Sequence, residues 1–254
     1  MNDTSEAILQ SLKDNFFAAS NITPEEKHTI LSSIITQITA QSDALQALVM
    51  KEVHLTASDA AKEIDRAKKT FTTAISYVNE PLPTKIVQSG KIVHERRRAR
   101  GPLLAITPFS SPLSSPAHKI SMGLLAGTSI ALKPSPFAQE SGRALFEIIQ
   151  TACNGKYVYF SDEQDDTVLS AIVADERIGI ISFTGGYETG KKIIRNGGVK
   201  KYHMELAGGN SPVIFTPQFD NYNDALVEKL VEGIVAKNGQ RCVSIKHIFL
   251  PGER

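Results

Sequence analysis

Two side chains in the C-terminal half have the chemical types that covalent catalysis needs. Cys242 follows a predicted helix and lies in the stretch Asn238-Gly239-Gln240-Arg241-Cys242-Val243-Ser244. An ordinary thiol has a pKa of about 8.5, so a lone cysteine is usually inert unless a base and an oxyanion-stabilising group lie nearby. Glu205 precedes the glycine-rich stretch Ala207-Gly208-Gly209-Asn210 and is the best acidic candidate for that base. The other cysteine, Cys153, is expected to be structural.

Two further features would suit a ligand that carries phosphate. Lys133 ends an apolar run and would place a cation at one edge of a sheet. The turn Thr184-Gly185-Gly186 enters a predicted helix, and free N–H groups at a helix N-terminus bind phosphate oxygens. Gly185 and Gly190 do not have the spacing of the usual dinucleotide-binding fingerprint, and such a turn alone is more often structural.

The elements that would position these residues alternate between apolar strands and helices. The predicted strands are Leu103–Thr107, Ser129–Lys133, Lys156–Phe160, Ile178–Phe183 and Lys201–Leu206. The helical segments begin near Pro112, Phe137, Gln164 and Gly186. This alternation predicts an α/β fold with a Rossmann-like, parallel five-stranded sheet and helices on both faces. Such sheets bind ligands at the carboxyl ends of their strands, where the candidate residues lie.

The segments on either side of this sheet also have recognisable patterns. The first eighty residues read as N-terminal helices, with a capping box at Thr23-Pro24-Glu25-Glu26 and further starts at Ser42-Asp43 and Ser58-Asp59. A hairpin is predicted at about 84–100. The C-terminal pattern is strand Val213–Phe215, helix Leu226–Ala236 and strand Lys246–Leu250. In that helix Leu226, Leu230, Ile234 and Val235 are expected to face inward. We therefore expect one domain at 1–208 and the first part of a second α/β domain at 209–254.

Composition and charge exclude several classes of protein. The 254 residues carry a formal net charge of +1, which does not favour general binding to nucleic acid. The cluster Arg96, Arg97, Arg98 and Arg100 is more readily a solvated or interface strand end, although a phosphate contact is the alternative. The N-terminus is unlike a signal peptide, and no apolar run approaches the roughly 18 residues of a membrane span. Cysteine and histidine are too few and too scattered for a structural zinc site. We expect a cytoplasmic protein without membrane, nucleic-acid or metal partners.

Seven short stretches are informative because of their order and spacing. They are Ile106-Thr107-Pro108-Phe109, His118-Lys119, Ala126-Gly127, Leu132-Lys133-Pro134-Ser135, Ile181-Ser182-Phe183-Thr184-Gly185, Glu205-Leu206 with Gly208-Gly209, and Gly239-Gln240-Arg241-Cys242. Together they resemble the aldehyde dehydrogenase superfamily over nearly all of the chain. The resemblance implies NAD- or NADP-dependent oxidation of a small aldehyde to a carboxylic acid through a cysteine thiohemiacetal and a thioester.

The resemblance assigns roles to individual residues. Cys242 matches the nucleophile, and Glu205 matches the base that activates water for deacylation. Ser110 stands where the family usually has an asparagine that helps to form the oxyanion hole. The cofactor-binding residues that it implies are Thr107, Pro108, Phe109, Lys133, Ser135, Pro136, Phe183, Thr184, Gly185, Gly186 and Leu206. Within this set Lys133 would hold the adenosine ribose, the stretch from Phe183 to Gly186 would meet the pyrophosphate, and the stretch from Thr107 to Phe109 would line the nicotinamide side.

Departures from the family pattern qualify these roles. NAD-preferring members often carry a ribose-binding glutamate where this chain has Pro136, so NADP is hypothesised to be tolerated or preferred. The stretch after Glu205 has one residue more than the family's, and Gly186 replaces a usual serine. The sequence ends at Arg254, one strand after Cys242, and is expected to be truncated within the catalytic domain. This chain alone is expected to bind cofactor weakly and to show little or no activity, whereas a completed chain would form a homodimer or homotetramer.

Two other functions stay open at the level of sequence. The first is a truncated, catalytically inactive paralogue that at most binds nucleotide or a partner subunit, which Ser110 and the extra residue after Glu205 favour. The second is a dehydrogenase in which coenzyme A takes the acyl group in place of water. Members of that type lack the base glutamate, so Glu205 argues against it.

Overall fold

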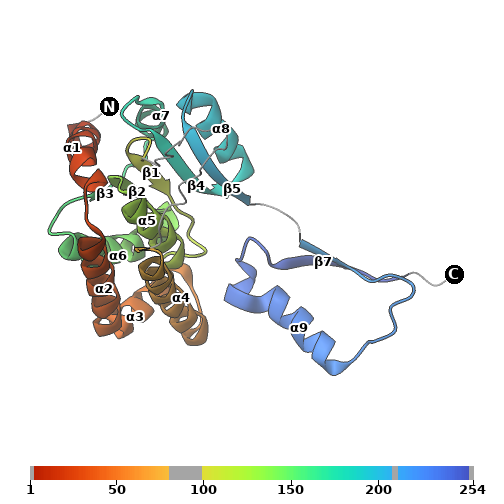
Figure 1. Ribbon diagram of the computed structural model, residues 1–254. Coiled ribbons are helices and arrows are strands. Elements are labelled where there is room, and N and C mark those ends of the chain that lie inside the picture. The colour runs from red at the N-terminus through yellow and green to blue at the C-terminus, as the bar shows by residue number, and fades with distance from the viewer. Residues whose placement is uncertain (1–2, 80–98, 208–210, 252–254) are drawn as a thin grey trace, which may run out of the picture.

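The computed structural model describes residues 3–79, 99–207 and 211–251, and nearly all of the predicted hairpin at 84–100 lies outside these ranges (Figure 1). The chain begins with four helices, α1 (Asp3–Ser20), α2 (Pro24–Ala40), α3 (Ser42–Val53) and α4 (Ala57–Ser76). The predicted capping box of α2 is present, because Thr23 accepts a hydrogen bond from the Glu26 N–H and the Glu26 carboxylate accepts one from the Thr23 N–H. The cap of α4 is Thr56 and not Ser58, since its hydroxyl accepts the N–H of Asp59.

A parallel five-stranded sheet forms the centre of the fold, as predicted. Its strands are β1 (Leu103–Ile106), β2 (Ile130–Lys133), β3 (Val158–Phe160), β4 (Ile180–Gly186) and β5 (Lys201–Ala207). The connecting helices are α5 (Ser114–Ala126), the short η1 (Pro136–Ala138), α6 (Gln139–Ala152), α7 (Asp166–Ala174) and α8 (Tyr187–Gly197). The spatial order is β3-β2-β1-β4-β5, with every neighbouring pair parallel. The order reverses between β1 and β4, which is where such sheets form a ligand crevice.

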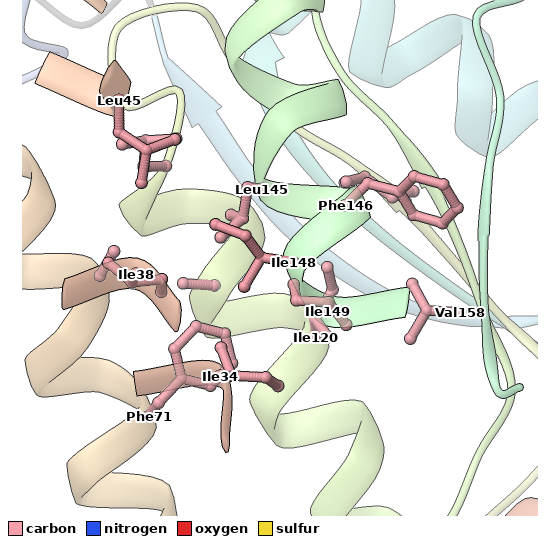
Figure 2. Close-up of a cluster of buried hydrophobic side chains, with 14 of the residues drawn as sticks. Ile34, Ile38, Leu45, Phe71, Ile120, Leu145, Phe146, Ile148, Ile149 and Val158 are labelled. Carbon is pink, nitrogen blue, oxygen red and sulfur yellow. The ribbon is translucent and has the colours of Figure 1, made fainter. Parts of the chain in front are cut away.

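Helices cover both faces of this sheet, so the central strands β1 and β2 are buried on two sides, whereas β5 at the edge is largely exposed. Successive residues of β1 point to opposite faces, and they enter two different cores. Leu103 and Ala105 join the core made with α2 to α6, whereas Leu104 packs with residues of α1, α7 and α8. Figure 2 shows the first core, in which side chains of α2, α3, α4, α5 and α6 meet. The N-terminal helices therefore bury their apolar faces on and around a sheet that follows them in sequence.

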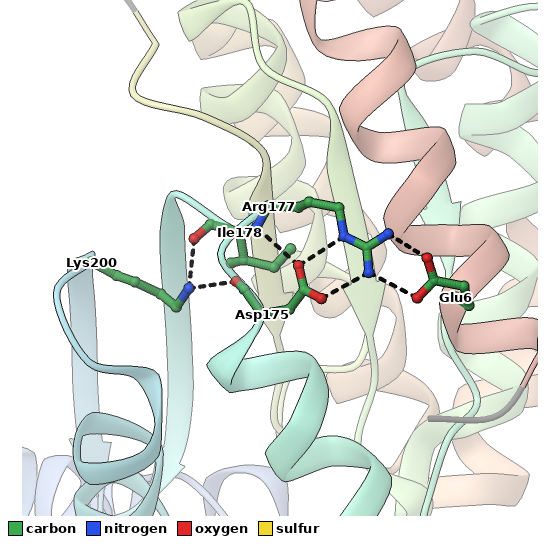
Figure 3. A network of polar contacts seen from close by, with 5 residues as sticks. All are labelled: Glu6, Asp175, Arg177, Ile178 and Lys200. Carbon is green, nitrogen blue, oxygen red and sulfur yellow. Dashed lines mark hydrogen bonds and ion pairs between the residues drawn. The ribbon is translucent and has the colours of Figure 1, made fainter.

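A polar network holds α1 on the face of the sheet that α7 and α8 also cover, opposite the first core (Figure 3). Arg177 donates to both carboxylate oxygens of Glu6, at 2.6 and 2.8 Å, and also to Asp175. Lys200 donates to the backbone carbonyls of Asp175 and Ile178 at 2.6 and 2.8 Å. The hydrogen bonds from Arg177 hold the pKa of the Asp175 and Glu6 carboxyls below their usual values. These contacts position α1, which the sequence patterns had not delimited within the helical N-terminal region.

Several strand boundaries differ from the prediction by one to three residues, and two of these differences have a clear structural reason. β4 continues to Gly186, beyond the predicted end at Phe183, because the register pairs Thr184 with Glu205 and Gly186 with Ala207. The predicted turn is therefore a strand that leads directly into α8. β3 begins at Val158 and not at Lys156, since Tyr157 has a left-handed backbone with φ of 68°.

The C-terminal residues form a smaller unit that has its own sheet. It consists of β6 (Ser211–Ile214), α9 (Asp224–Val235), η2 (Ala236–Gly239) and β7 (Ile245–Phe249), with β6 and β7 parallel. This is the predicted strand–helix–strand order. The predicted inward face of α9 is not buried, although the helix contacts η2 and β7: Leu226 and Leu230 are half-buried, while Ile234 and Val235 are exposed.

Candidate active site

A cavity of about 1080 Å³ lies at the carboxyl ends of β1, β2 and β4. Its walls come from the segments that follow these strands, from α7 and α8, and from residues 239–242 of the C-terminal unit. All but two of the predicted site residues line it, namely Thr107, Pro108, Phe109, Ser110, Lys133, Ser135, Pro136, Phe183, Thr184, Gly185, Gly186 and Cys242. The exceptions are Glu205 and Leu206. The fold thus brings residues from separate stretches of the chain to one space.

The segments after β1 and β2 form one wall. The backbone N–H of Thr107 donates to the carbonyl of Lys133 at 3.0 Å, which extends the pairing of the two strands into the site. The ring of Phe109 meets Phe137 edge-on with centroids 5.9 Å apart. Ser135 caps η1 by accepting the N–H of Phe137. Together these contacts fix the backbone of both segments around the cavity mouth.

Lys133 places a buried cation in this wall. Its side chain is 7% exposed, and Nζ donates to the carbonyl of Pro134 at 3.1 Å. Burial lowers the pKa of the Lys133 ammonium, while the carboxylates of Glu163 and Asp166 oppose that shift. With one fixed acceptor, the ammonium keeps donor capacity for hydroxyl or phosphate oxygens of a ligand.

The segment from β4 into α8 forms the opposite wall. Gly186 is the N-cap of α8 and has no side chain to bond the first-turn N–H groups, which leaves them available to a ligand. A Cβ on Gly185 would lie 2.5 Å from the ring of Phe183, so this close approach requires glycine. A Cβ on Gly186 would meet nothing within 4 Å, so the absence of a side chain there leaves open space in the wall.

Glu205 lies on β5 behind this wall. The hydroxyl of Thr184 donates a very short hydrogen bond to Oε2 of Glu205, and Nζ of Lys119 lies 3.6 Å from the same oxygen. Burial alone would raise the pKa of Glu205, but the Thr184 hydrogen bond and the charges of Lys119 and His203 outweigh it and hold the pKa below its usual value. The carboxylate is therefore ionised at neutral pH, and Thr184 is its link to the cavity.

Cys242 lies on the loop between η2 and β7 with its residue exposed. Two contacts hold the start of this loop and the adjoining η2 to the end of α3: Asn238 donates to the carbonyl of His54 at 2.5 Å, and Gln240 donates to the carbonyl of Val53 at 3.3 Å. Cys153 contrasts with it, because it is buried at the end of α6 and burial raises the pKa of its thiol to about 12. Only Cys242 is thus available as a thiol in the cavity.

Several residues of the site had no part in the sequence prediction. Thr189, Lys192, Ile193 and Asn196 line the cavity from one side of α8, and their helical spacing was a usable signal. Lys237 is buried and pairs with Glu63 of α4, and Nζ of Lys237 also donates to the carbonyl of Ser110. No pattern in the sequence connects these two residues.

No group of three or more His, Cys, Asp or Glu side chains is arranged to hold a metal ion in the part of the chain that the structure describes. Among the same residues, each helix is too short or too polar to cross a membrane.

Known proteins resemble this chain in sequence and in fold. The sequence profile of the aldehyde dehydrogenase family matches residues 2–254. Lactaldehyde dehydrogenase of Methanococcus aeolicus is 30% identical over 257 residues, which cover 99% of this chain and 54% of that protein. Glyceraldehyde-3-phosphate dehydrogenase of Methanocaldococcus jannaschii, solved with NADP, superposes with a TM-score of 0.88 at 26% identity, over 96% of this chain and 54% of the other.

A more distant structure shows the same fold with the other cofactor. Betaine aldehyde dehydrogenase of Staphylococcus aureus, solved with NAD+, gives a TM-score of 0.85 at 23% identity, over 96% of this chain and 49% of that one. The chain therefore spans about half the length of the relatives that it matches. The profile match over residues 2–254 covers almost every residue of the chain, which is a member of the aldehyde dehydrogenase family.

Proposed function

We propose that this chain supplies the NAD(P)-binding part and the nucleophile of a dehydrogenase that oxidises a small aldehyde to a carboxylic acid. The observation that carries the proposal is a cavity that has Lys133, the open N-terminus of α8 and the Cys242 residue on its walls. A nucleotide needs a cation and free N–H donors, and an aldehyde needs a nucleophile. One space offers all three.

The residues present fit a dinucleotide. Lys133 would hold the adenosine ribose together with Ser135 and Pro136, and the stretch from Phe183 to Gly186 would receive the pyrophosphate. The segment Thr107–Phe109 would line the nicotinamide side, and Leu206 would support α8 from β5, where its side chain packs against Gly190. When bound, the nicotinamide supplies the acceptor for a hydride. A cofactor placed along these walls would lie between Lys133 and Cys242.

The residues of the chain then divide the chemistry between them. The Cys242 thiolate would attack the aldehyde carbon to give a thiohemiacetal on the protein, and this adduct would become a thioester once its hydride had left. Glu205 removes a proton from a water molecule, which attacks the thioester and releases the acid and the thiol. Overall, aldehyde, water and oxidised cofactor give acid, reduced cofactor and a proton. The carboxylate of Glu205 is ionised, as a general base must be.

The oxyanion that forms at each attack needs donors near Cys242. Ser110 lines the cavity at the position of the family's asparagine, and its hydroxyl is a shorter donor than an amide. Loss of one such donor typically costs about 10²–10³ in rate. We therefore propose a slow enzyme even when the chain is part of a longer one.

NADP is proposed as an accepted cofactor, and Pro136 is the reason. Proline has no carboxylate to repel a 2′-phosphate, and Lys133 and Lys192 both line the cavity. A side-by-side titration with NADP and NAD tests this: the absence of NADP binding at concentrations where NAD binds would contradict it, and equal or tighter binding of NAD would exclude a preference for NADP.

A nucleotide-binding protein without turnover is the second candidate. The position of Glu205 favours it, because the carboxylate is bonded to Thr184 and Lys119 and does not line the cavity.

We further propose a cytoplasmic location, a division of the chain at 208–209 between the two sheets, and assembly into a homodimer or homotetramer as part of a longer chain.

One experiment tests the proposed site directly. NADP at saturating concentration should slow the alkylation of Cys242 by iodoacetamide at least several-fold, because thiol and cofactor would share the cavity. The buried Cys153 is the internal control, and the Cys242→Ala variant shows which thiol is modified. If neither NADP nor NAD at saturating concentration slowed the alkylation of Cys242, the placement of the cofactor beside this thiol would be overturned. In a longer chain that includes these residues, formation of NAD(P)H on addition of an aldehyde, lost in Cys242→Ala and kept in Cys153→Ala, separates the dehydrogenase from a protein that only binds nucleotide.

A further inference from the structure

Lys237 and Glu63 form a buried ion pair between two segments far apart in the sequence. Nζ of Lys237 lies 2.6 Å from Oε2 of Glu63, and the two side chains are 3% and 0% exposed. Buried charges are costly unless they are paired and hydrogen-bonded, so such a pair restrains the two backbones that carry it. The proposed catalytic steps use neither residue.

The ammonium of Lys237 has two more acceptors, and both belong to the segment after β1. Nζ donates to the carbonyl of Ser110 at 2.8 Å and to the hydroxyl of Ser111 at 3.1 Å. An ammonium has three N–H donors, so all three are engaged. Lys237 therefore connects three parts of the chain: its own loop, α4, and the cavity wall that contains Ser110.

Glu63 holds the same wall from its other side. Its Oε1 accepts the backbone N–H groups of Leu113 and Ser114, at 3.2 and 2.8 Å, and the Ser114 hydroxyl at 2.8 Å. These donors lie at the start of α5, where a carboxylate is favourable. The ion pair thus fixes the stretch from Ser110 to Ser114 at both of its ends.

The backbone around Lys237 adopts a conformation that requires such support. Lys237, Asn238 and Gly239 all have left-handed φ values, of 54°, 56° and 69°. This region is unfavourable for residues other than glycine and persists only where the surroundings enforce it. The Lys237 N–H donates to Asp59 at 2.9 Å, which with the ammonium contacts holds the strained turn in place. Cys242 follows this turn in the sequence.

We propose that Lys237 is a positioning residue for Cys242. Its ammonium binds the carbonyl of Ser110 and thereby anchors the loop that contains the Cys242 thiol. The distance between this thiol and the Ser110 side of the cavity is therefore fixed. The inference rests on the proposed function, since it assigns Lys237 to the site where Cys242 attacks the aldehyde. A purely stabilising pair would contribute to the free energy of unfolding, and its loss would leave the native geometry around Cys242 unchanged.

The double variant Lys237→Met with Glu63→Gln tests this. It removes both charges together, which avoids an unpaired buried carboxylate, and the introduced glutamine keeps a carbonyl oxygen for the N–H groups of α5. The matched control is Lys51→Met with Glu140→Gln, an ion pair of 3.4 Å whose side chains are 74% and 61% exposed. The milder variant Ser111→Ala removes one acceptor of the ammonium and keeps the pair, in case the double variant does not fold.

Two readouts on the full 254-residue chain distinguish positioning from stability. The first is amide hydrogen exchange in residues 108–113 and 237–244. The second is the ¹⁹F spectrum of a trifluoromethyl label on Cys242, which is selective because Cys153 is buried. We expect at least ten-fold faster exchange in both segments of the double variant, unchanged exchange in β1 and β2, and a shifted or split ¹⁹F resonance. Ser111→Ala should give the same pattern with about two- to five-fold faster exchange.

Other outcomes of these measurements would overturn the proposal. Unchanged exchange in either segment, a uniform increase that includes β1 and β2, or an unmoved ¹⁹F resonance in a folded variant would overturn the proposal, as would the same response in the Lys51 control. Neither readout needs a cofactor or an aldehyde. A failure of NADP to protect Cys242 would therefore remove the proposed function without changing these two measurements.

Discussion

Thr184 and Glu205 are directly paired across β4 and β5, and the Thr184 hydroxyl donates to the Glu205 carboxylate. Thr184 also lines the cavity, whereas Glu205 lies behind it. The hydroxyl is thus the connection between a candidate base and the space where a substrate would react.

Replacing Thr184 by Val should raise the pKa of Glu205, because the variant loses a hydrogen bond that stabilises the ionised form. The depressed pKa in the folded state stabilises the wild type above the unfolded pKa of about 4.3, and this stability is lost as pH falls through the folded pKa. The free energy of unfolding of the variant should therefore depend less on pH in this range. Carboxyl ¹³C NMR titration measures the shift. Thr189→Val is the control, since Thr189 lines the cavity and no hydrogen bond joins it to Glu205. An unshifted titration in Thr184→Val would contradict the assignment.

Replacing Glu205 by Gln should slow deacylation more than hydride transfer, since only the water attack needs the base. In a chain that turns over, we expect a retained burst of NAD(P)H followed by a steady state slowed by about 10²-fold or more. Rapid-mixing absorbance separates the two phases. A lost burst with normal release of acid would show that Glu205 has another role.

Replacing Gly185 by Ala should disturb the phosphate side of the cavity. The new Cβ would lie 2.5 Å from the ring of the buried Phe183, and such overpacking typically costs about 1–3 kcal/mol. Gly186→Ser is the matched neighbour, because its Cβ enters open space and a serine can cap α8. Its stability should change by less than about 0.5 kcal/mol. Urea unfolding and NADP titration check both variants, and equal effects at the two positions would refute the packing argument.

Replacing Arg177 by Met should loosen α1 in a pH-dependent way. Arg177 lowers the pKa of Asp175 and Glu6, so its stabilisation is present above their unfolded pKa values and fades as pH falls through the folded ones. We expect a Tm lower by roughly 2–4 °C at pH 7.

The difference in Tm between wild type and Arg177→Met should become smaller at acid pH, as thermal scans at about pH 7 and about pH 3 would show. Arg143→Met, which breaks a more exposed pair with Asp162, should change Tm by less than about 1 °C at either pH. A constant gap across pH would point to packing of the Arg177 side chain and not to its charge.

Local patterns predicted most of the fold. The alternation of strands and helices predicted the parallel sheet, and the Thr23 capping box predicted the start of α2, because both depend on residues close in sequence. The missed boundary at Tyr157 depends on one left-handed residue with no glycine to mark it. The extension of β4 to Gly186 depends on its pairing with β5, a contact that no single segment encodes.

The candidate site was predicted less completely, for a related reason. Residues after strand ends could be listed from topology, so Lys133 and Gly185 were found. Lys237 and Glu63 are 174 residues apart, and neither differs in sequence from an ordinary surface residue on a helix or loop. The direction in which Glu205 points also depends on its cross-strand partner Thr184. Burial of charge and side-chain direction are tertiary properties that periodicity does not reveal.

The docking of α1 has a consequence for how the chain is made. Glu6 meets Arg177 across 171 positions of sequence, and the carbonyl of Leu12 accepts the hydroxyl of Ser129 across 117. Helix α1 is therefore synthesised well before the partners on which it docks. At about 5–20 residues per second, this delay lasts on the order of ten seconds or more, during which Leu9 and Leu12 have no core to enter. The apolar face of α1 is thus a surface that a chaperone could cover until those later segments are synthesised.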